Sequence, residues 1–332
     1  MRKIIAYSLV LLIVLAAVGI SMTIGWRPFI GPKTRALTNR TFVANPPRLE
    51  RGQYLAEKVM GCFYCHSERD WKAPGAPPMT GRKGAGAAFP GGPGKLFAPN
   101  ITSDRETGVG AWTDDMLARA IREGVDKNGK TLFPIMPYQN YSNLSDEDLG
   151  SLVVYLRTIP PVKNAVPESE IIFPVNRLIN AVPQPITTEI AVRDLSNPID
   201  RGEYLTTQAS CADCHTPRVQ GRPIPGLAFA GGFAFNEPIG PVVSANITPD
   251  PSGISFYDEN MFVTMMRTGQ VGARKLNPTM PFSGYGGMTD EDLKAILAYL
   301  RTLTPVSHRV DNTEPPTPCK LCKVSHGLGD RN

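Results

Sequence analysis

The sequence contains two copies of one series of motifs, and this internal repeat constrains the fold more than any other feature. The matching elements occur in the same order in both copies: residues 51–55 with 201–205, 61–66 with 210–215, 100–102 with 246–248, 134–137 with 278–281, and 145–149 with 289–293. The offset drifts only from 149 residues (Cys62 to Cys211) to 144 (Met136 to Met280). Ordered motifs at a nearly constant spacing indicate a duplicated domain.

Each copy is predicted to be mainly helical. We expect a first helix near 49–61 and 199–210, a middle helix near 113–123 and 257–268, and a last helix after Ser145 and Thr289. Ser145 and Thr289 are typical N-cap residues, and the acids that follow them suit the helix dipole. Apolar residues then recur at i, i+3, i+4 and i+7, which predicts a buried stripe: Leu149, Leu152, Val153 and Leu156, and Leu293, Ile296, Leu297 and Leu300. Gly and Pro supply 63 of the 332 residues, so long loops are expected between the helices.

The N-terminal region is long and apolar. Residues 4–24 carry no charge, and a helix of that length spans about 31 Å, enough for a hydrocarbon core of roughly 30 Å. A cleaved signal peptide usually has an apolar run of only about 7–15 residues. We therefore favour an uncleaved anchor over residues 1–26, with a cleaved signal as the alternative. Arg2 and Lys3 favour a cytoplasmic N-terminus, and the rest of the chain is expected to be exported.

Each copy carries a C-x-x-C-H motif, which is typical of covalent haem c attachment. The residues are Cys62, Cys65 and His66 in the first copy, and Cys211, Cys214 and His215 in the second. Two thiols at this spacing can reach the two vinyl groups of one porphyrin, and the adjacent histidine can bind the iron. A thioredoxin-type motif would need a βαβ setting, and a shared four-cysteine zinc site would leave both histidines without a role. Two covalent haem c groups are therefore predicted.

A second axial ligand is predicted for each iron. Only His308 and His326 remain outside the two motifs, and both lie in the C-terminal tail. Met136 and Met280 instead occupy matching Pro-x-Met-Pro loops in the two copies. Ligation by histidine and methionine raises the reduction potential and leaves no open iron position, which suits electron transfer.

These elements together resemble class I cytochrome c domains. More narrowly, residues 46–306 resemble the membrane-associated diheme and multiheme cytochrome c subunits of periplasmic alcohol or gluconate dehydrogenases. The resemblance implies a mainly α fold with two tandem class I cytochrome c domains behind an N-terminal transmembrane helix. The expected boundaries are 1–26 for the anchor or signal, 46–163 for the first domain, 164–196 for a linker, 197–306 for the second domain and 307–332 for a tail.

The resemblance implies an electron carrier rather than an enzyme. The expected donor is a periplasmic dehydrogenase or another redox protein, and the expected acceptor is a quinone, an oxidase or a further cytochrome, with no nucleic acid partner. The expected location is the cytoplasmic membrane, with a single N-terminal pass and the haem domains in the periplasm or outside the cell. A haem enzyme, such as a diheme peroxidase or a thiosulfate-oxidising cytochrome, is the alternative and would need an open or unusually ligated iron. A haem-based sensor or assembly protein is a third interpretation.

Charge differs between the two halves of the exported part. Residues 27–163 contain 19 Lys and Arg against 13 Asp and Glu, a net of +6, whereas residues 164–306 contain 10 against 14, a net of −4. Since complementary charge steers encounter between proteins, we expect two docking faces, one for the donor and one for the acceptor.

Two smaller patterns leave alternatives open. Asn100-Ile101-Thr102 and its partner at 246–248 fit a glycosylation sequon, but their presence in both copies favours a role in shaping the haem pocket. In the tail, Cys319-x-x-Cys322 is followed by lysine rather than histidine. A local disulfide is favoured there, because an exported compartment is oxidising. The alternatives are a metal site using Cys319, Cys322 and His326, with or without His308, and free thiols. A third haem is a further alternative, for which 26 residues offer too little chain.

Overall fold

The computed structural model describes residues 2–89 and 91–332, which form two compact units. Unit 1 contains residues 2–41, 112–143 and 170–189. Unit 2 contains residues 42–111 (apart from residue 90), 144–169 and 190–332. The term first copy denotes residues 46–163 and the term second copy residues 197–306.

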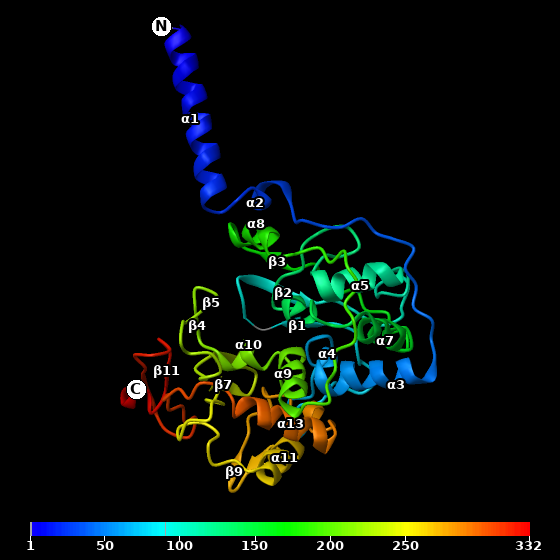
Figure 1. Cartoon of the computed structure of the whole chain (residues 1–332), viewed down its shortest axis with the longest axis vertical. Coiled ribbons are helices and arrows are strands. Elements are labelled where there is room, and N and C mark those ends of the chain that lie inside the picture. The colour runs from blue at the N-terminus through cyan, green and yellow to red at the C-terminus, as the bar shows by residue number, and fades with distance from the viewer. Residues whose placement is uncertain (1, 90) are drawn as a thin grey trace. The chain divides into compact units, whose positions relative to one another are not determined.

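Unit 1 is built from helices joined by extended segments. Its elements are α1 (Arg2–Met22), α2 (Arg27–Ile30), α5 (Asp114–Glu123), α6 (Tyr138–Tyr141), β3 (Glu170–Ile171), α8 (Val175–Leu178) and the 3₁₀ turn η2 (Ile179–Ala181). The short helix α2 packs on α8 and η2, and α5 packs on α6. Helix α1 has no buried residue and is long and apolar enough to cross a membrane (Figure 1).

Unit 2 contains the cysteine motifs and the last helix of both copies. In the first copy it holds α3 (Pro46–Tyr54), the π turn η1 (Leu55–Val59), α4 (Cys62–Cys65) and α7 (Asp146–Leu156). In the second copy it holds α9 (Pro198–Gln208), α10 (Cys211–His215), α11 (Glu259–Thr268), α12 (Phe282–Tyr285) and α13 (Asp290–Leu300). Helix α3 packs on α7, and α9 packs on α13 in the same way.

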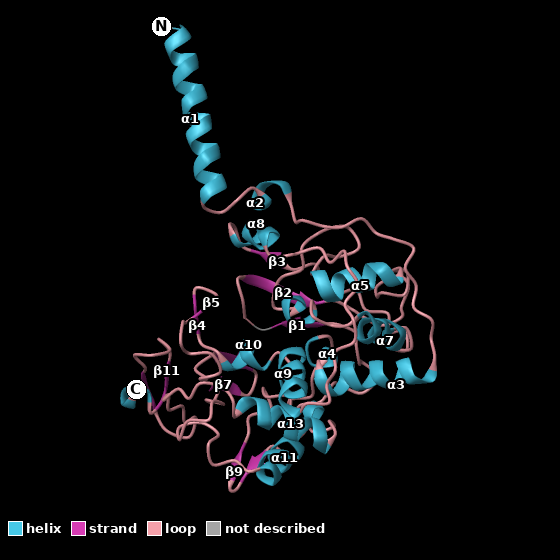
Figure 2. Cartoon of the chain, in the orientation of Figure 1, coloured by secondary structure: helices cyan, strands magenta, loops and turns pink. Residues whose placement is uncertain are grey.

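The strands are short and pair as antiparallel hairpins between long loops (Figure 2). The pairs in unit 2 are β1 (Ala87–Phe89) with β2 (Gly94–Ala98), β4 (Arg218–Val219) with β5 (Arg222–Pro223), β6 (Ala234–Glu237) with β7 (Gly240–Val243), β8 (Gln270–Val271) with β9 (Arg274–Lys275), and β10 (Pro316–Pro318) with β11 (Ser325–Gly327). A 3₁₀ turn, η3 (Gly329–Arg331), ends the chain. The helices therefore form the framework, as the repeat in the sequence predicts.

The first and last helices of each copy cross at a glycine. A Cβ atom on Gly52 would lie 2.0 Å from the carbonyl oxygen of Ser151, and one on Gly202 would lie 2.0 Å from the carbonyl oxygen of Ala295. Both contacts are far inside van der Waals distance, so only glycine permits the helices to approach this closely. The helix packing therefore requires the glycine of the Arg-Gly-x-Tyr-Leu pattern that both copies share.

The predicted last helices and their caps are confirmed. The Ser145 hydroxyl accepts from the Asp148 amide, and the Thr289 hydroxyl accepts from the Asp292 amide. The predicted apolar stripes are buried in both helices. Asparagine caps both first helices, Asn45 before Pro46 and Asn197 before Pro198. Copy one differs in its final turn, which widens to a π turn in which the Met60 amide donates to the Leu55 carbonyl.

The segment after residue 306 is folded rather than extended. Two hydrogen bonds join Asn312 to the backbone of Val243 in β7, at 2.9 and 2.8 Å. The favoured disulfide is wrong, because Cys319 and Cys322 are both free thiols and both buried. His308, before the Cys-x-x-Cys turn, and His326, after it, instead lie beside the two thiols.

Candidate haem sites

The four motif cysteines lie on two equivalent short helices. Cys62 and Cys65 are on α4, and Cys211 and Cys214 are on α10. The residue before each helix is left-handed, with φ of 60° at Gly61 and 57° at Ser210, so the chain turns sharply before it presents the thiols. All four thiols are free, and the second cysteine of each motif is exposed. This arrangement fits thioether formation with one porphyrin at each motif.

Each motif histidine is oriented by a backbone carbonyl. Nδ1 of His66 donates to the Pro99 oxygen at 2.8 Å, and Nδ1 of His215 donates to the Ala245 oxygen at 2.7 Å. Since Nδ1 carries the proton, Nε2 keeps the lone pair that binds a metal. Burial lowers the pKa of both imidazoles, against a smaller opposing effect of the hydrogen bond. Both rings are therefore held neutral in the tautomer that suits iron.

The Asn-Ile-Thr element holds that carbonyl in place. In the first copy, Oδ1 of Asn100 accepts from the amide and hydroxyl of Thr102 at 2.9 and 2.7 Å, and Nδ2 donates to the Val162 oxygen at 2.8 Å. Asn100 directly follows Pro99 and is buried. A buried, hydrogen-bonded amide does not fit a glycosylation site, and its position supports the role in shaping the haem pocket.

The second copy repeats this network. Oδ1 of Asn246 accepts from the amide and hydroxyl of Thr248 at 2.9 and 2.8 Å, and Nδ2 donates to the Val306 oxygen at 2.7 Å. Asn246 directly follows Ala245, whose carbonyl accepts from His215. The two copies therefore share the residues that position the histidine as well as the histidine itself.

The two methionine loops have the same local structure. The Met136 amide donates to Phe133 at 3.1 Å and the Met136 carbonyl accepts from Tyr138 at 2.8 Å, and the Met280 loop makes both bonds with Asn277 and Phe282 at 3.0 and 2.8 Å. The proline after each methionine has φ near −80° and ψ near +50°, the inverse γ-turn region (φ −82°, ψ 48° and φ −78°, ψ 50°). Both methionines are half-buried.

The structure gathers the predicted ligands differently in the two copies. Unit 2 contains all four ligands of the second copy, Cys211, Cys214, His215 and Met280. Unit 2 also contains Cys62, Cys65 and His66 of the first copy, whereas Met136 belongs to unit 1. In haem c two thiols bond to the porphyrin, and an imidazole with a thioether can coordinate the iron. The residues of the second copy, which lie in one unit, fit this group, and the ligand assignment itself stays a prediction in both copies.

The first cysteine motif contacts the methionine loop of the second copy. Nη2 of Arg69 donates to the carbonyl of Pro278 at 2.6 Å, two residues before Met280. The Tyr64 hydroxyl is hydrogen-bonded to the Ser283 hydroxyl, which donates to the Gly75 carbonyl at 3.0 Å. The sequence did not predict this contact, since Tyr64 occupies a variable position of the C-x-x-C-H motif and Arg69 lies outside it.

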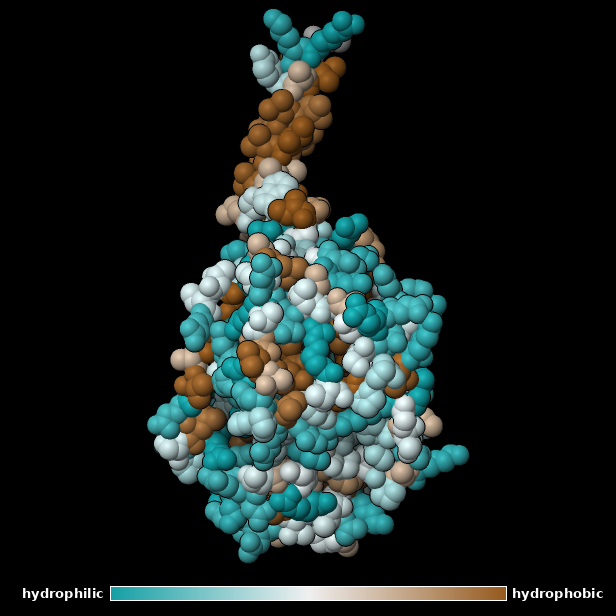
Figure 3. All heavy atoms as spheres, turned by 90° about the vertical axis from the view of Figure 1, so that its right-hand side faces the viewer, coloured by the Kyte–Doolittle hydropathy of each residue, from teal (hydrophilic) through white to brown (hydrophobic). Residues whose placement is uncertain are grey.

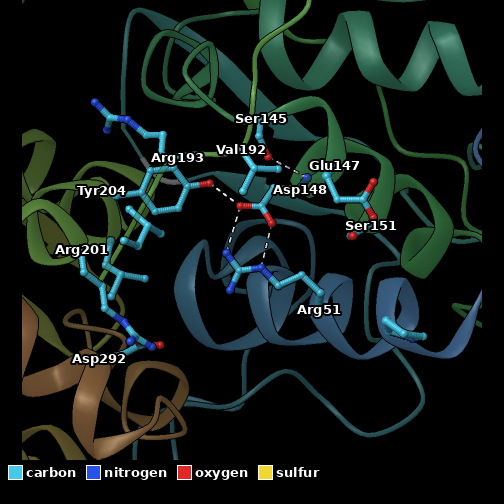
Figure 4. A pocket seen from close by; sticks show the side chains of 13 residues that line it. Arg51, Ser145, Glu147, Asp148, Ser151, Val192, Arg193, Arg201, Tyr204 and Asp292 are labelled. Carbon is cyan, nitrogen blue, oxygen red and sulfur yellow. Dashed lines mark hydrogen bonds and ion pairs between the residues drawn. The ribbon is translucent and has the colours of Figure 1, made fainter. Parts of the chain in front are cut away.

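A cavity of about 460 Å³ lies between the helices of the two copies in unit 2 (Figure 4). Its lining includes Arg51 and Asp148 from the first copy and Arg201, Tyr204 and Asp292 from the second. Arg51 and Tyr204 both donate to the Asp148 carboxylate. None of the described residues that line this cavity is a predicted haem ligand. The cavity is thus part of the contact between the copies.

Comparison with known proteins agrees with this geometry. The family model of cytochrome c matches residues 199–304. The alcohol dehydrogenase (quinone) cytochrome c subunit of Gluconobacter oxydans is 27% identical over 79% of this chain and 56% of its own length. The gluconate 2-dehydrogenase cytochrome c subunit of Pantoea cypripedii is 30% identical over 78% of this chain and 60% of its own length. A diheme cytochrome c-type protein of Cereibacter sphaeroides is 27% identical over 74% of this chain and 83% of its own length.

The chain spans a little over half of the length of the two dehydrogenase subunits. The similarity to the diheme cytochrome covers 74% of this chain, whereas the family model matches the second copy alone. The chain therefore contains a cytochrome c domain, the domain type that carries covalently attached haem c, and it is similar along most of its length to the cytochrome c subunits of dehydrogenases.

Proposed function

We propose that this protein is a membrane-anchored diheme c-type cytochrome that relays electrons from a periplasmic dehydrogenase to a quinone, an oxidase or another cytochrome. The observation that carries the proposal is the duplicated histidine environment. His66 and His215 each donate from Nδ1 to a carbonyl that a buried Asn-Ile-Thr element holds. Both imidazoles keep a free lone pair on Nε2, which indicates two metal sites of the same kind.

The residues that hold each group follow from the repeat, in two tandem class I cytochrome c domains. The first domain supplies Cys62, Cys65, His66 and Met136, and the second supplies Cys211, Cys214, His215 and Met280. Haem iron bound with these ligands takes up and releases one electron without an open coordination position. The chain's own part is to keep each imidazole neutral, to fix its ring through the carbonyl, and to hold each methionine in a proline-bounded loop.

The contact between the copies supports a relay rather than two separate carriers. Tyr64 lies within the first motif and Arg69 just after it, and they bond to Ser283 in α12 and to the Pro278 carbonyl of the second copy. Electron transfer between two centres depends on a short, fixed separation. Hydrogen bonds between one attachment motif and the other copy's ligand loop keep that separation constant.

Exposed apolar side chains near the end of α1 favour an anchor over a cleaved signal. Trp26 and Phe29 lie directly after α1, and both are exposed, as is Phe173 in the segment before α8. Figure 3 shows apolar side chains along the length of α1. Aromatic residues concentrate where a transmembrane helix leaves the hydrocarbon core. A chain whose signal had been cleaved would expose these side chains to water instead.

A dehydrogenase as donor is proposed from the complexes to which the similar cytochrome subunits belong, and the charge difference between the halves supplies two distinct docking surfaces. The basic surface belongs to residues 27–163 and the acidic one to residues 164–306. Electron-transfer rates with donor and acceptor should then both fall with ionic strength. Salt-independent rates with both partners would contradict this assignment.

Electron paramagnetic resonance of the oxidised, detergent-purified protein tests the proposal. Two low-spin ferric signals, counted as two spins per chain, are expected from two closed irons. A high-spin or thiolate-ligated signal would mean that one iron is open or differently ligated, and the haem enzyme would then be the better assignment. Membrane fractionation tests the anchor: the intact chain should stay with the membrane after an alkaline wash, and a form that starts at residue 27 should not.

A further inference from the structure

The segment after residue 306 gathers four metal-ligating side chains that the proposed relay does not use. They are His308, Cys319, Cys322 and His326, and all four are buried. Their ligand atoms lie within 4.8 Å of one another. Apolar side chains would pack better in this position than two thiols and two imidazoles. The four residues therefore indicate a role other than packing.

The local fold brings three of the four together on one hairpin. Strands β10 and β11 pair so that Thr317 lies opposite His326, and the two cysteines occupy the turn between the strands. The Cys319 amide donates to the Val324 carbonyl at 3.2 Å, which closes the turn around the Cys-x-x-Cys segment. Lys323 completes the turn in the left-handed region, with φ of 64°. This turn holds both sulfur atoms within 4.8 Å of the imidazole ligand atoms.

The imidazoles are oriented as metal ligands. Nδ1 of His308 donates to the Ala230 carbonyl at 2.7 Å, and Nδ1 of His326 donates to the Gly327 carbonyl at 3.0 Å. Nε2 of both rings therefore keeps its lone pair. Nε2 of His308 lies 3.4 Å from Sγ of Cys319, whereas Nε2 of His326 is buried without a hydrogen-bond partner. A buried polar atom without a partner destabilises the fold, and a bound metal ion would remove that cost.

We propose that His308, Cys319, Cys322 and His326 bind one zinc ion through two sulfur and two Nε2 atoms. Four-coordinate Cys₂His₂ sets select zinc, and with Zn–S of about 2.3 Å and Zn–N of about 2.0–2.1 Å they place ligand atoms roughly 3.3–3.8 Å apart. The His308–Cys319 separation already falls in that range. Since four protein ligands leave no position for water or substrate, the site is structural.

The zinc site is joined to the histidine of the second copy. Ala230, whose carbonyl accepts from His308, is followed by Gly231, whose amide donates to the His215 carbonyl at 2.7 Å. Gly232 comes next, and a Cβ there would lie 2.6 Å from Cβ of Cys322 and 2.8 Å from Cε1 of His308. One loop thus touches both the zinc ligands and the cysteine-motif histidine. The zinc ion would fasten the tail to the second haem site and not to the first.

Metal analysis of the full-length, detergent-purified protein tests the site directly. Elemental analysis should find one zinc per chain besides the haem iron. Absorption spectroscopy at the zinc edge, where iron does not interfere, should give about two sulfur neighbours near 2.3 Å and two nitrogen neighbours near 2.0–2.1 Å. Cys322→Ser should lose most of the zinc, whereas Lys320→Ala, an exposed non-ligand in the same turn, should keep it.

Three results would overturn the proposal. The first is that the protein contains no zinc even after incubation with zinc chloride under reducing conditions. The second is a Cys319–Cys322 disulfide in the protein as isolated. The third is an iron content that exceeds the haem content. The wild-type measurements decide the matter even where Cys322→Ser fails to fold. Haem content and ferric spin signals of the same samples report on the proposed relay separately, so the loss of one assignment leaves the other standing.

Discussion

The hydroxyl of Tyr204 in the second copy donates a hydrogen bond to the carboxylate of Asp148 in the first. The reverse pair is also present, since the Tyr54 hydroxyl donates to Asp292. Each acid lies in the first turn of a last helix, and each tyrosine lies in a first helix. The contact between the copies is therefore reciprocal, with one copy completing the helix N-terminus of the other.

Replacing Tyr204 by Phe should destabilise the protein by about 1–3 kcal/mol, because a buried bond to a carboxylate is lost while the carboxylate remains. Chemical denaturation followed by circular dichroism measures the effect. Combining Tyr204→Phe with Asp148→Asn in a double-mutant cycle isolates the pair. Tyr299→Phe, at the end of α13 and outside this contact, serves as the control and should change stability by less. Additive single effects would contradict a direct interaction.

Stability should fall in alkaline solution through Tyr54. Burial, with Asp292 adding to it, raises the Tyr54 pKa to about 12, against about 10 in an unfolded chain. The unfolded chain therefore loses this proton first, so the stabilisation is present below about pH 10 and is lost as the pH rises towards 12. Tyr54 is partly exposed, which reduces the expected loss to roughly 1–2 kcal/mol. Denaturation of wild type and Tyr54→Phe between about pH 9 and 11 should show a steeper decline in the wild type.

Met280→His should lower one midpoint potential and leave the other in place. Replacing thioether by imidazole removes the ligand that raises the potential, and a fall of roughly 0.1–0.3 V is expected within the span of about 0.8 V that axial ligands cover. Spectroelectrochemical titration of the holoprotein resolves the two centres. Met79→Ala, at an exposed methionine, is the matched control. Two unchanged potentials would show that Met280 is not a ligand.

Asn246→Ala should loosen the His215 carbonyl support and destabilise the second copy. The side chain makes bonds to Thr248 and to Val306 that alanine cannot replace, so a loss of about 2–4 kcal/mol is expected. The potential of the second centre should shift with it, and Asn100→Ala should act in the same way on the first centre. Thermal melts and potentiometric titrations check both. Shifts in stability alone, with both potentials fixed, would limit these residues to packing.

The sequence predicted most of what depends on local pattern. Helices bounded by Ser145 and Thr289, with stripes of apolar residues, follow from capping and periodicity, which short segments determine. The Tyr54–Asp292 pair did not follow, because the two residues are 238 positions apart and neither was singled out for its chemistry. The favoured disulfide in the tail was wrong for a similar reason, because the sequence does not show which residues the fold places beside the thiols. His308 approaches Cys319 only once the hairpin folds back on the Ala230 loop.

The glycines where the first and last helices cross have a consequence for how this protein can change over time. At Gly52 and Gly202 the contact is between one helix and the main-chain oxygen of another. A contact with a main-chain oxygen does not depend on which side chain that residue carries. Substitutions elsewhere in the sequence should thus leave unchanged the orientation of each first helix, which leads into a cysteine motif. The outer surface can exchange residues, and with them redox partners, while the internal spacing of the centres is inherited unchanged.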